Sequence, residues 1–194
     1  LDAGRGTIRQ VTIAPELPGG LDAIRLIVDA GAVAAVGHTS ADAETAVAAF
    51  DSGATVLTHA FNAMPGIHHR APGPVLAAAG DRRVVLEVIA DGVHLDPHVI
   101  KLVFDSAPGR VALVTDAMAA AGSADGHYDL GAVSVTVEDG VARADDTGSI
   151  AGSTLTQDDA LRRAVAAGAP LTEAVRALTE TPACLLYTSD AADE

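Results

Sequence analysis

The feature that most constrains this sequence is a set of short apolar runs that alternate with stretches of helical pattern. We expect the runs to be strands, at residues 11–15, 32–36, 54–60, 84–90 and 111–115. Most residues in these runs are apolar, which is typical of parallel strands that are covered on both faces. Strands that alternate with helices indicate an α/β protein built on a parallel sheet.

The stretches between and after the strands carry helix signals. We expect helices at about residues 21–30, 40–51, 75–79, 97–107, 155–168 and 172–180. Thr39 or Ser40 is the expected N-cap of the second helix and Thr156 that of the fifth, because hydroxyl side chains accept hydrogen bonds from the first free N–H groups. Pro182 is expected to end the last helix.

Between residues 128 and 146 the pattern changes to an alternation of apolar and polar residues. Such a pattern predicts strands, and Asp139-Gly140 signals a tight hairpin turn. We therefore expect a β-hairpin insertion. Five parallel strands are too few for a closed (β/α)8 barrel of roughly 250 residues, so a partial barrel and an open doubly wound sheet are the alternatives. No glycine-rich phosphate fingerprint follows the first strand, which disfavours dinucleotide binding.

Three of the expected strands lead into a residue that can bind a metal or move a proton, namely His38, His59 and Asp116. Carboxyl ends of parallel strands meet at one edge, so we expect these side chains to lie close together. Neutral imidazoles on adjacent strand ends can bind one metal ion, typically zinc or iron. Asp116 can take a proton from water and return it to a leaving amine. The alternative is structural, with the histidines bonded to carbonyls and Asp116 capping a helix.

Other groups near the expected strand ends are candidates for binding a substrate. They are Asn62, Arg70, His94, Ile150, Ala151 and Gly152. An amide can bind a sugar or phosphate oxygen, a guanidinium suits a phosphate, and N–H groups before a helix can hold an anion. Asn62 and Arg70 lie on a long loop of the kind that is often functional. The alternatives are a solvated loop, a surface histidine and simple helix capping.

Composition argues against several classes of partner. The formal net charge is −14 without a basic stripe, which argues against nucleic acid. No run of about 18 apolar residues is present, so neither a transmembrane helix nor a membrane partner is expected. The first residues lack a signal-peptide pattern. The single Cys184 cannot form an intramolecular disulfide, so a reducing cytoplasm is the expected location.

Residues 184–194, CLLYTSDAADE, differ in character from the sequence before them. They resemble the translation of a sequencing-library adapter read in frame. We therefore expect residues 1–183 to form the native domain and residues 184–194 to be a non-native tail, which should be left out of arguments about the fold. An ordinary acidic carboxyl terminus is the alternative.

Seven motifs form a set along the chain: VTIAPE, GHTSA, THAFNAMP, RAPG, IADGVH, LVTDAM and IAGSTLT. Together, and in this order, they resemble the N-acetylglucosamine-6-phosphate deacetylases of the amidohydrolase superfamily. The resemblance covers essentially residues 8–183. THAFNAMP, IADGVH and VTDAM in combination are specific, whereas GH or TDA alone would not be.

The resemblance implies a metal-dependent enzyme that deacetylates N-acetylglucosamine 6-phosphate. Its fold would be a (β/α)8 barrel beside a small β-sandwich, and its assembly a homodimer. His38 and His59 would bind a divalent metal, zinc or iron, and Asp116 would donate and accept the proton. The residues that would contact the sugar phosphate or its acetamide are Asn62, Ala63, Arg70, His94, Ile150, Ala151 and Gly152. The phosphate-binding arginine can be shared across the dimer interface.

One part of the family pattern is absent from this sequence. The family supplies a third metal ligand, a glutamate of an EGPF-type motif, and a substrate-binding histidine from earlier in the barrel, and neither motif occurs here. We do not assign Glu16, in the later TIAPE motif, to this role. The chain is therefore expected to be the C-terminal part of the enzyme, with weak metal binding because a catalytic zinc usually has three protein ligands. The alternatives are an amidohydrolase acting on a cyclic amide or dipeptide, and an inactive fragment that binds sugar phosphate weakly at most.

Overall fold

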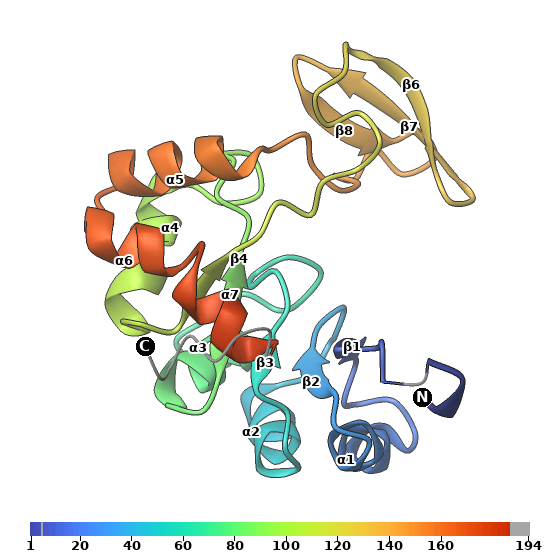
Figure 1. Ribbon diagram of the computed structural model, residues 1–194, viewed down its shortest axis with the longest axis vertical. Helices are drawn as coiled ribbons and strands as arrows, with labels where there is room; N and C mark the ends of the chain where they lie inside the picture. The colour runs from blue at the N-terminus through green and yellow to red at the C-terminus, as the bar shows by residue number, and fades with distance from the viewer. Residues whose placement is uncertain (5, 187–194) are drawn as a thin grey trace.

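The computed structural model describes residues 1–4 and 6–186, and its centre is a parallel sheet of five strands. Figure 1 shows how the helices and a smaller sheet are arranged around it. The strands are β1 (Gln10–Ile13), β2 (Val33–Val36), β3 (Val56–Leu57), β4 (Val85–Val88) and β5 (Val111–Leu113). Each strand pairs in parallel with the next one along the chain. The α/β class and the five parallel strands expected from the sequence are confirmed.

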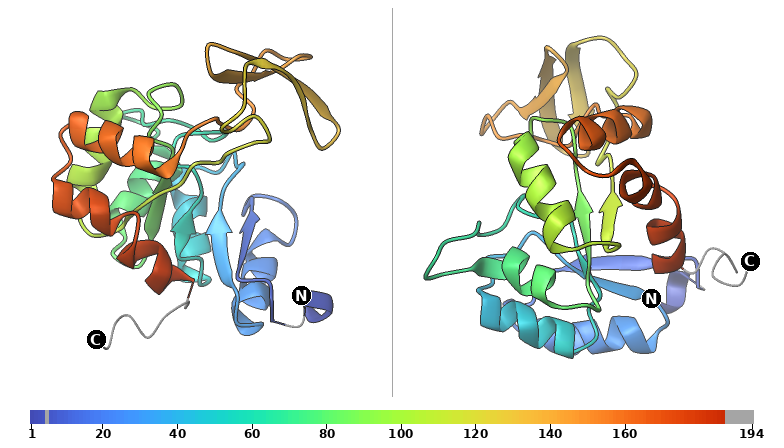
Figure 2. Two further views of the ribbon diagram at one scale, coloured as in Figure 1. Left: turned by 45° about the horizontal axis from the view of Figure 1, so that its top comes forward. Right: turned by 90° about the vertical axis from the view of Figure 1, so that its left-hand side faces the viewer.

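Helices pack against this sheet. They are α1 (Gly20–Asp29), α2 (Ala43–Asp51), α3 (Gly73–Gly80), α4 (Pro97–Ser106), α5 (Gln157–Ala166), α6 (Leu171–Arg176) and α7 (Glu180–Leu185), preceded by the 3-10 helix η1 (Asp2–Gly4). Helices α1 to α6 pack against one face of the sheet, and α7 packs against the other. One apolar cluster joins helix residues to alternate strand residues such as Ala34 and Val36. Figure 2 shows α1 to α4 following one another along the outside of the sheet. Each helix of the described residues is too short or too polar to cross a membrane.

The strand order distinguishes between the two α/β architectures. A doubly wound sheet reverses its strand order at a switch point, whereas the described strands follow one another without a reversal. The doubly wound alternative is therefore wrong. The observed order is that of a singly wound sheet, in which every helix that follows a strand crosses on the same side.

The opposite face of the sheet mixes apolar and polar side chains. Its apolar cluster consists of Val33, Ala35 and Val56, with Leu185 of α7 packed against them. Nearer the strand ends, the hydroxyls of Thr12 and Thr58 lie 3.0 Å apart. Gly37 lies beside both, and a Cβ at this position would come within 2.8 Å of each threonine side chain. The close approach of three strand ends therefore requires glycine at position 37.

The segment after β5 forms a second, antiparallel sheet instead of the single hairpin expected at residues 128–146. Its strands are β6 (Gly126–Leu130), β7 (Val133–Glu138) and β8 (Val141–Ala144), paired in that order. The tight turn at Asp139-Gly140 is confirmed, with φ angles of 51° and 74°. Residues 128–130 of the expected stretch belong to β6, whose pairing with β7 was not predicted because Asp139-Gly140 signals only the turn between β7 and β8.

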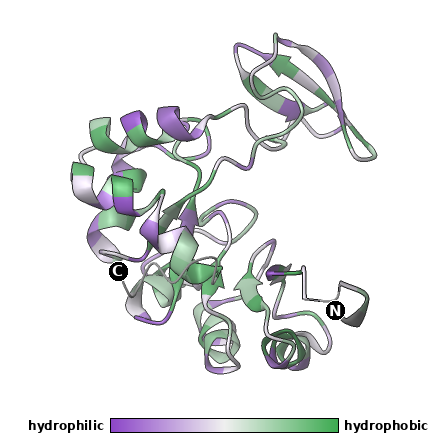
Figure 3. Cartoon of the chain, in the orientation of Figure 1, coloured by the Kyte–Doolittle hydropathy of each residue, from purple (hydrophilic) through white to green (hydrophobic). Residues whose placement is uncertain are grey.

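This small sheet has its own core. Val135, Val137 and Ala142 pack on Met118 and Ala120, which belong to the segment that leads from β5 into the small sheet. Figure 3 shows hydrophobic residues concentrated on the parallel strands, while the small sheet alternates between hydrophobic and hydrophilic residues. Only the hydrophobic face of the small sheet is therefore suited to packing against the rest of the chain, such as Met118 and Ala120.

Several expected element boundaries differ from the structure. The strands expected at 54–60 and 111–115 end at Leu57 and Leu113, because the chain turns into a left-handed conformation soon afterwards. The helix expected at 172–180 is two helices, α6 and α7. Pro182 does not end it, since it lies in the first turn of α7, where a missing N–H group costs little. Residues 187–194 of the expected tail lie outside the described residues.

The expected N-caps were also partly wrong. Asp42, not Thr39 or Ser40, caps α2 by accepting a hydrogen bond from the Thr45 N–H group (2.8 Å). Thr156 stands at the N-cap of α5 but makes no capping hydrogen bond with its side chain. The reason for the first difference is that Thr39 and Ser40 are engaged elsewhere, in the site described below.

A single arginine holds the end of α3 against the strand that follows it. Nη1 of Arg110 donates to the carbonyl oxygens of Ala78 (3.3 Å), Asp81 (2.8 Å) and Val84 (2.6 Å), and Nη2 donates to that of Ala79 (2.7 Å). The last carbonyls of a helix have no partners within the helix itself. Arg110 immediately precedes β5, so it joins α3, β4 and β5.

We expect Arg110→Met to lower the free energy of unfolding by about 2–3 kcal/mol, because hydrogen bonds to charged groups contribute roughly 1.5–3 kcal/mol. Urea unfolding followed by circular dichroism measures the change. Arg82→Met is the matched control, since Arg82 is exposed and its loss should cost less than about 0.5 kcal/mol. Equal losses in the two variants would show that Arg110 does not brace these elements.

Candidate active site

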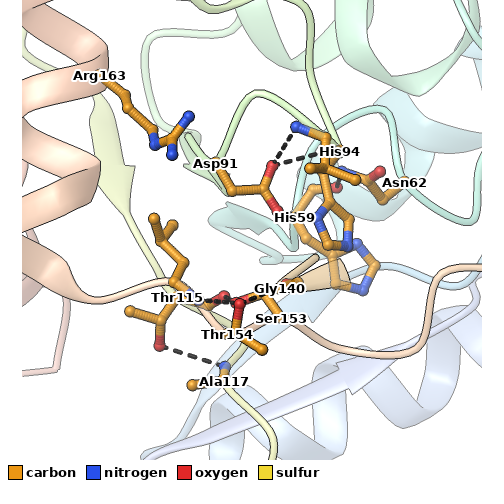
Figure 4. Close-up of polar contacts among 12 residues, drawn as sticks. His59, Asn62, Asp91, His94, Thr115, Ala117, Gly140, Ser153, Thr154 and Arg163 are labelled. Carbon is orange, nitrogen blue, oxygen red and sulfur yellow. Dashed lines mark hydrogen bonds and ion pairs between the residues drawn. The ribbon is translucent and has the colours of Figure 1, made fainter. Parts of the chain in front are cut away.

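The three strand-end residues meet in one cavity of about 600 Å³. His38, His59 and Asp116 share its lining with Asn62, Ala63, His94, Ala117, Met118, Leu130, Ser149, Ile150, Ala151 and Gly152. The structure thus brings together every candidate residue of the sequence analysis except Arg70. The cavity lies where the parallel sheet meets the linkers of the small sheet, and Figure 4 shows the grouping of His59, Asn62 and His94.

The backbone turns sharply at each of the three strand ends. The φ angles of His38, His59 and Asp116 are 47°, 29° and 50°. Residues other than glycine rarely adopt this left-handed region, and where they do the strain is often associated with function. The three turns explain why the strands end earlier than their apolar runs.

The two histidines are in direct contact. Their Nε2 atoms lie 2.9 Å apart, and their rings meet edge to face at 75°. Burial lowers the pKa of His59, and the charge of the neighbouring His38 lowers it further. Its side chain is therefore biased toward the neutral form, which is the form that binds metal ions. Among the described residues, Nδ1 of His59 is a buried atom without a hydrogen-bond partner.

This donor pair suits a divalent metal ion. Two nitrogens bound to one zinc at about 2.0–2.1 Å with tetrahedral geometry lie roughly 3.3 Å apart, close to the observed separation of 2.9 Å. Within the described residues, however, no group of three or more His, Cys, Asp or Glu side chains could hold a metal. His38 and His59 therefore fit a metal as a pair of ligands and not as a complete set.

Glu16, which the sequence analysis left unassigned, is committed to another role. Its carboxylate accepts hydrogen bonds from the Ser40 N–H group (2.7 Å), the Ser40 hydroxyl (3.1 Å) and the Thr39 hydroxyl. Burial acts to raise the pKa of Glu16, but these hydrogen bonds outweigh it and hold the pKa below its usual value. Glu16 therefore fixes the turn that follows His38.

Asp116 is held in place by the segment that follows the small sheet. The Ser153 N–H group donates to the Asp116 carbonyl (2.8 Å), and the Ser153 hydroxyl donates to the carbonyl of Thr115. Gly152 packs so closely that a Cβ there would lie 3.1 Å from the Asp116 carbonyl oxygen. The expected substrate-binding segment 150–152 is thus tied to the expected catalytic residue.

The loop after β3 is tied to its neighbours as well. The amide nitrogen of Asn62 donates to the carbonyls of His59 (3.2 Å) and Ala60 (3.3 Å). The carbonyl of Ala63 accepts a hydrogen bond from the Thr39 N–H group (3.0 Å). These contacts fix Asn62 and Ala63 at the wall of the cavity.

Arg70 lies apart from this cavity. It lines a separate hollow of about 430 Å³ with residues of the α2 start, such as Ser40 and Glu44. Its Nη1 atom lies 2.7 Å from Nε2 of His69, and both side chains are exposed. The structure of one chain therefore does not bring Arg70 to His38, His59 and Asp116.

Sequence reasoning missed Glu87, a buried acidic residue of β4. Its side chain accepts a hydrogen bond from Nε2 of Gln10 (2.9 Å), and its backbone carbonyl accepts one from the Ala60 N–H group (2.7 Å). Burial raises the pKa of Glu87, against the opposing effect of hydrogen bonds from Gln10 and the His59 backbone. Glu87 therefore supports the His59 turn. A lone acidic residue in the apolar run VVLEVIA was the signal for it.

Comparisons with known proteins add to this geometry. No protein-family model matches the chain. The chain is 42% identical over 181 residues to an N-acetylgalactosamine-6-phosphate deacetylase of Escherichia coli O157:H7. This match covers 93% of the chain and 48% of that protein. The chain is also 40% identical over 158 residues to an N-acetylglucosamine-6-phosphate deacetylase of Bacillus subtilis, and this match covers 81% of the chain and 40% of that protein. The chain spans about half the length, or less, of these curated relatives.

Solved structures agree with the sequence matches. The chain resembles a mutant N-acetyl-D-glucosamine-6-phosphate deacetylase of Mycobacterium smegmatis, solved in complex with N-acetyl-D-glucosamine-6-phosphate, with a TM-score of 0.94 and 50% identity over 96% of the chain and 51% of that protein. For the Thermotoga maritima deacetylase the TM-score is 0.89 with 33% identity, over 95% of the chain and 51% of that protein. These similarities confirm the resemblance seen in the motifs and identify the chain as the counterpart of a C-terminal portion of the N-acetylglucosamine-6-phosphate deacetylase family.

Proposed function

We propose that the complete protein hydrolyses the acetamide of N-acetylglucosamine 6-phosphate to glucosamine 6-phosphate and acetate. The observation that carries the proposal is the convergence of His38, His59 and Asp116 in one cavity. The cavity belongs to a chain that is 50% identical to a deacetylase solved with this sugar phosphate. A galactosamine epimer is a second candidate, because one relative at 42% identity is an N-acetylgalactosamine-6-phosphate deacetylase.

We interpret the five-stranded sheet as part of a (β/α)8 barrel. Its strands follow one another in sequence order, helices α1 to α6 share one apolar cluster on one face, and His38, His59 and Asp116 follow the carboxyl ends of the strands. Active sites of such barrels lie at this end. The (β/α)8 interpretation therefore places the cavity where the fold family places its chemistry.

The proposed reaction uses the histidines and Asp116 in separate roles. His38 and His59 would hold a divalent metal ion, zinc or iron, which when bound supplies polarisation of the acetamide carbonyl and a lower pKa for water. The carboxylate of Asp116 accepts a proton from the water that attacks the carbonyl carbon. As the carbon–nitrogen bond breaks, Asp116 returns this proton to the departing amine.

The remaining candidates would bind the sugar phosphate. Asn62, Ala63 and His94 line the cavity together with the 150–152 segment, of which Gly152 lies beside Asp116. Backbone groups of a rigid segment position an acetamide well because they cannot rotate away. Arg70 would bind the phosphate in the cavity of a second copy, which requires a homodimer.

The first test is acetate release by the complete protein, supplied with zinc or iron, from each of the two 6-phosphorylated epimers. We expect Asp116→Asn to lower kcat by about 10²–10⁴-fold, the usual contribution of a general acid and base, with unchanged metal content. Asp22→Asn, on the exposed surface of α1, is the control. An active Asp116→Asn variant would contradict the assigned role. A parent protein that hydrolyses an unphosphorylated cyclic amide or dipeptide instead would contradict the proposed substrate.

A second prediction concerns metal affinity. We expect this 194-residue chain to bind zinc weakly, because a catalytic zinc usually has three protein ligands. His59→Gln should weaken the binding further, by about tenfold or more. Competition against a chromophoric chelator measures both values. His98→Gln should change nothing, since His98 is 97% exposed and away from the cavity. Equal zinc affinities of the unmodified 194-residue chain and its His59→Gln variant would refute the proposed pair of metal ligands.

A third prediction tests whether Arg70 acts in a second copy. Arg70→Ala and Asp116→Asn variants of the complete protein are each expected to be nearly inactive. Mixed after unfolding and refolding together, they should regain about a quarter of the wild-type activity, because half of the dimers would be mixed and each would hold one intact site. If the mixture is no more active than its two components, Arg70 does not act across an interface.

A further inference from the structure

His94 of the cavity wall forms a pair with Asp91 behind it, and this pair has no part in the reaction assigned to Asp116. Nδ1 of His94 lies 2.6 Å from Oδ2 of Asp91 (Figure 4). Only 7% of the His94 side chain and 12% of the Asp91 side chain are exposed. His94 also lines the cavity that contains His38 and His59. The pair is therefore a buried element of the site and not a chance surface contact.

The two carboxylate oxygens of Asp91 make different contacts. Oδ1 accepts hydrogen bonds from the N–H groups of Val93 (2.8 Å) and His94 (2.7 Å), which closes the turn after β4. Gly92, with a φ of 74°, allows this turn. Oδ2 contacts the imidazole ring. Because Oδ1 alone closes the turn, the contact between Oδ2 and the ring is an additional one that the turn does not require.

Asp91 is the acceptor in this pair. Burial acts to raise the pKa of Asp91, but hydrogen bonds from the His94 ring and from the two N–H groups outweigh it and hold the pKa below its usual value. An ionised carboxylate has no hydrogen to donate, so Nδ1 of His94 carries the hydrogen. Nε2 is then the nitrogen left for a ligand, and none of the described residues hydrogen-bonds to it.

We propose that Asp91 is a positioning residue for substrate binding, which fixes the ring of His94 with its hydrogen on Nδ1 so that Nε2 accepts a hydrogen bond from a hydroxyl group of the bound sugar phosphate. This inference rests on the proposed function. A hydrogen bond to the second ring nitrogen sets both the tautomer and the orientation of an imidazole. Loss of this contact should reduce substrate affinity and leave the proton transfer by Asp116 largely intact.

Asp91→Asn separates the two contacts. Asparagine retains an oxygen for the N–H groups of Val93 and His94, and it places an amide donor opposite Nδ1. The hydrogen of neutral His94 should therefore move from Nδ1 to Nε2. We expect the KM for N-acetylglucosamine 6-phosphate to rise by about tenfold or more, with kcat changed by less than about threefold. Nitrogen-15 NMR of the histidine ring reports the tautomer, and His94→Gln identifies its signals.

The chain offers a matched control pair on its surface. Oδ1 of Asp96 accepts hydrogen bonds from the His98 N–H group and from Nδ1 of His98, both at 2.8 Å. The exposed fractions are 64% for Asp96 and 97% for His98. Asp96→Asn removes the same kind of carboxylate–imidazole contact away from the cavity. It should leave KM and kcat unchanged.

Two results would overturn the role of Asp91. One is a neutral His94 with its hydrogen on Nε2 in the unmodified chain, a measurement that needs no folded variant. The other is an Asp91→Asn protein with unchanged KM and unchanged tautomer. If the complete protein deacetylates neither epimer, the proposed function fails, whereas the NMR measurement still decides whether Asp91 sets the state of His94.

Discussion

The parallel pairing of consecutive strands is the constraint on which the rest of the structure depends. Because β1 to β5 run in the same direction and pair in sequence order, their carboxyl ends form a single edge. His38 and His59 follow neighbouring strands, so their Nε2 atoms come within 2.9 Å although 21 residues separate them in sequence. The turn after β5 adds Asp116 to the same cavity. The sheet, and not any local sequence around these residues, therefore creates the site.

Strand pairing alone does not hold the side chains in their observed directions. A left-handed backbone conformation of a residue other than glycine costs about 1–3 kcal/mol, and four such residues, His38, His59, Ala63 and Asp116, line the cavity. Each of the three strand-end turns is held by a polar residue from another element. Glu16 supports the turn after His38, Glu87 supports the His59 turn, and Ser153 bonds to the backbone at Asp116. The site can therefore form only after separate elements have docked.

This dependence explains what the sequence could and could not predict. Apolar runs and their polar ends are local patterns, so the five strands and the grouping of His38, His59 and Asp116 were predictable. The strand ends were placed too late because the left-handed turns leave no composition signal in residues such as His59. Glu87 and Ser153 were not recognised as supports, since their partners are distant in sequence. Arg70 lies in a loop whose position no periodicity determines, so its role stays a prediction.

The two faces of the parallel sheet divide stability and chemistry between them. One face packs alternate residues such as Ala34 and Val36 against the helices in a continuous apolar cluster. The other face carries the buried Glu87, and the cavity at its edge holds His59, whose Nδ1 atom has no hydrogen-bond partner among the described residues. Burying such groups without full compensation costs free energy. The apolar face must offset that cost, so the same alternation of side chains that builds the core also allows a polar site beside it.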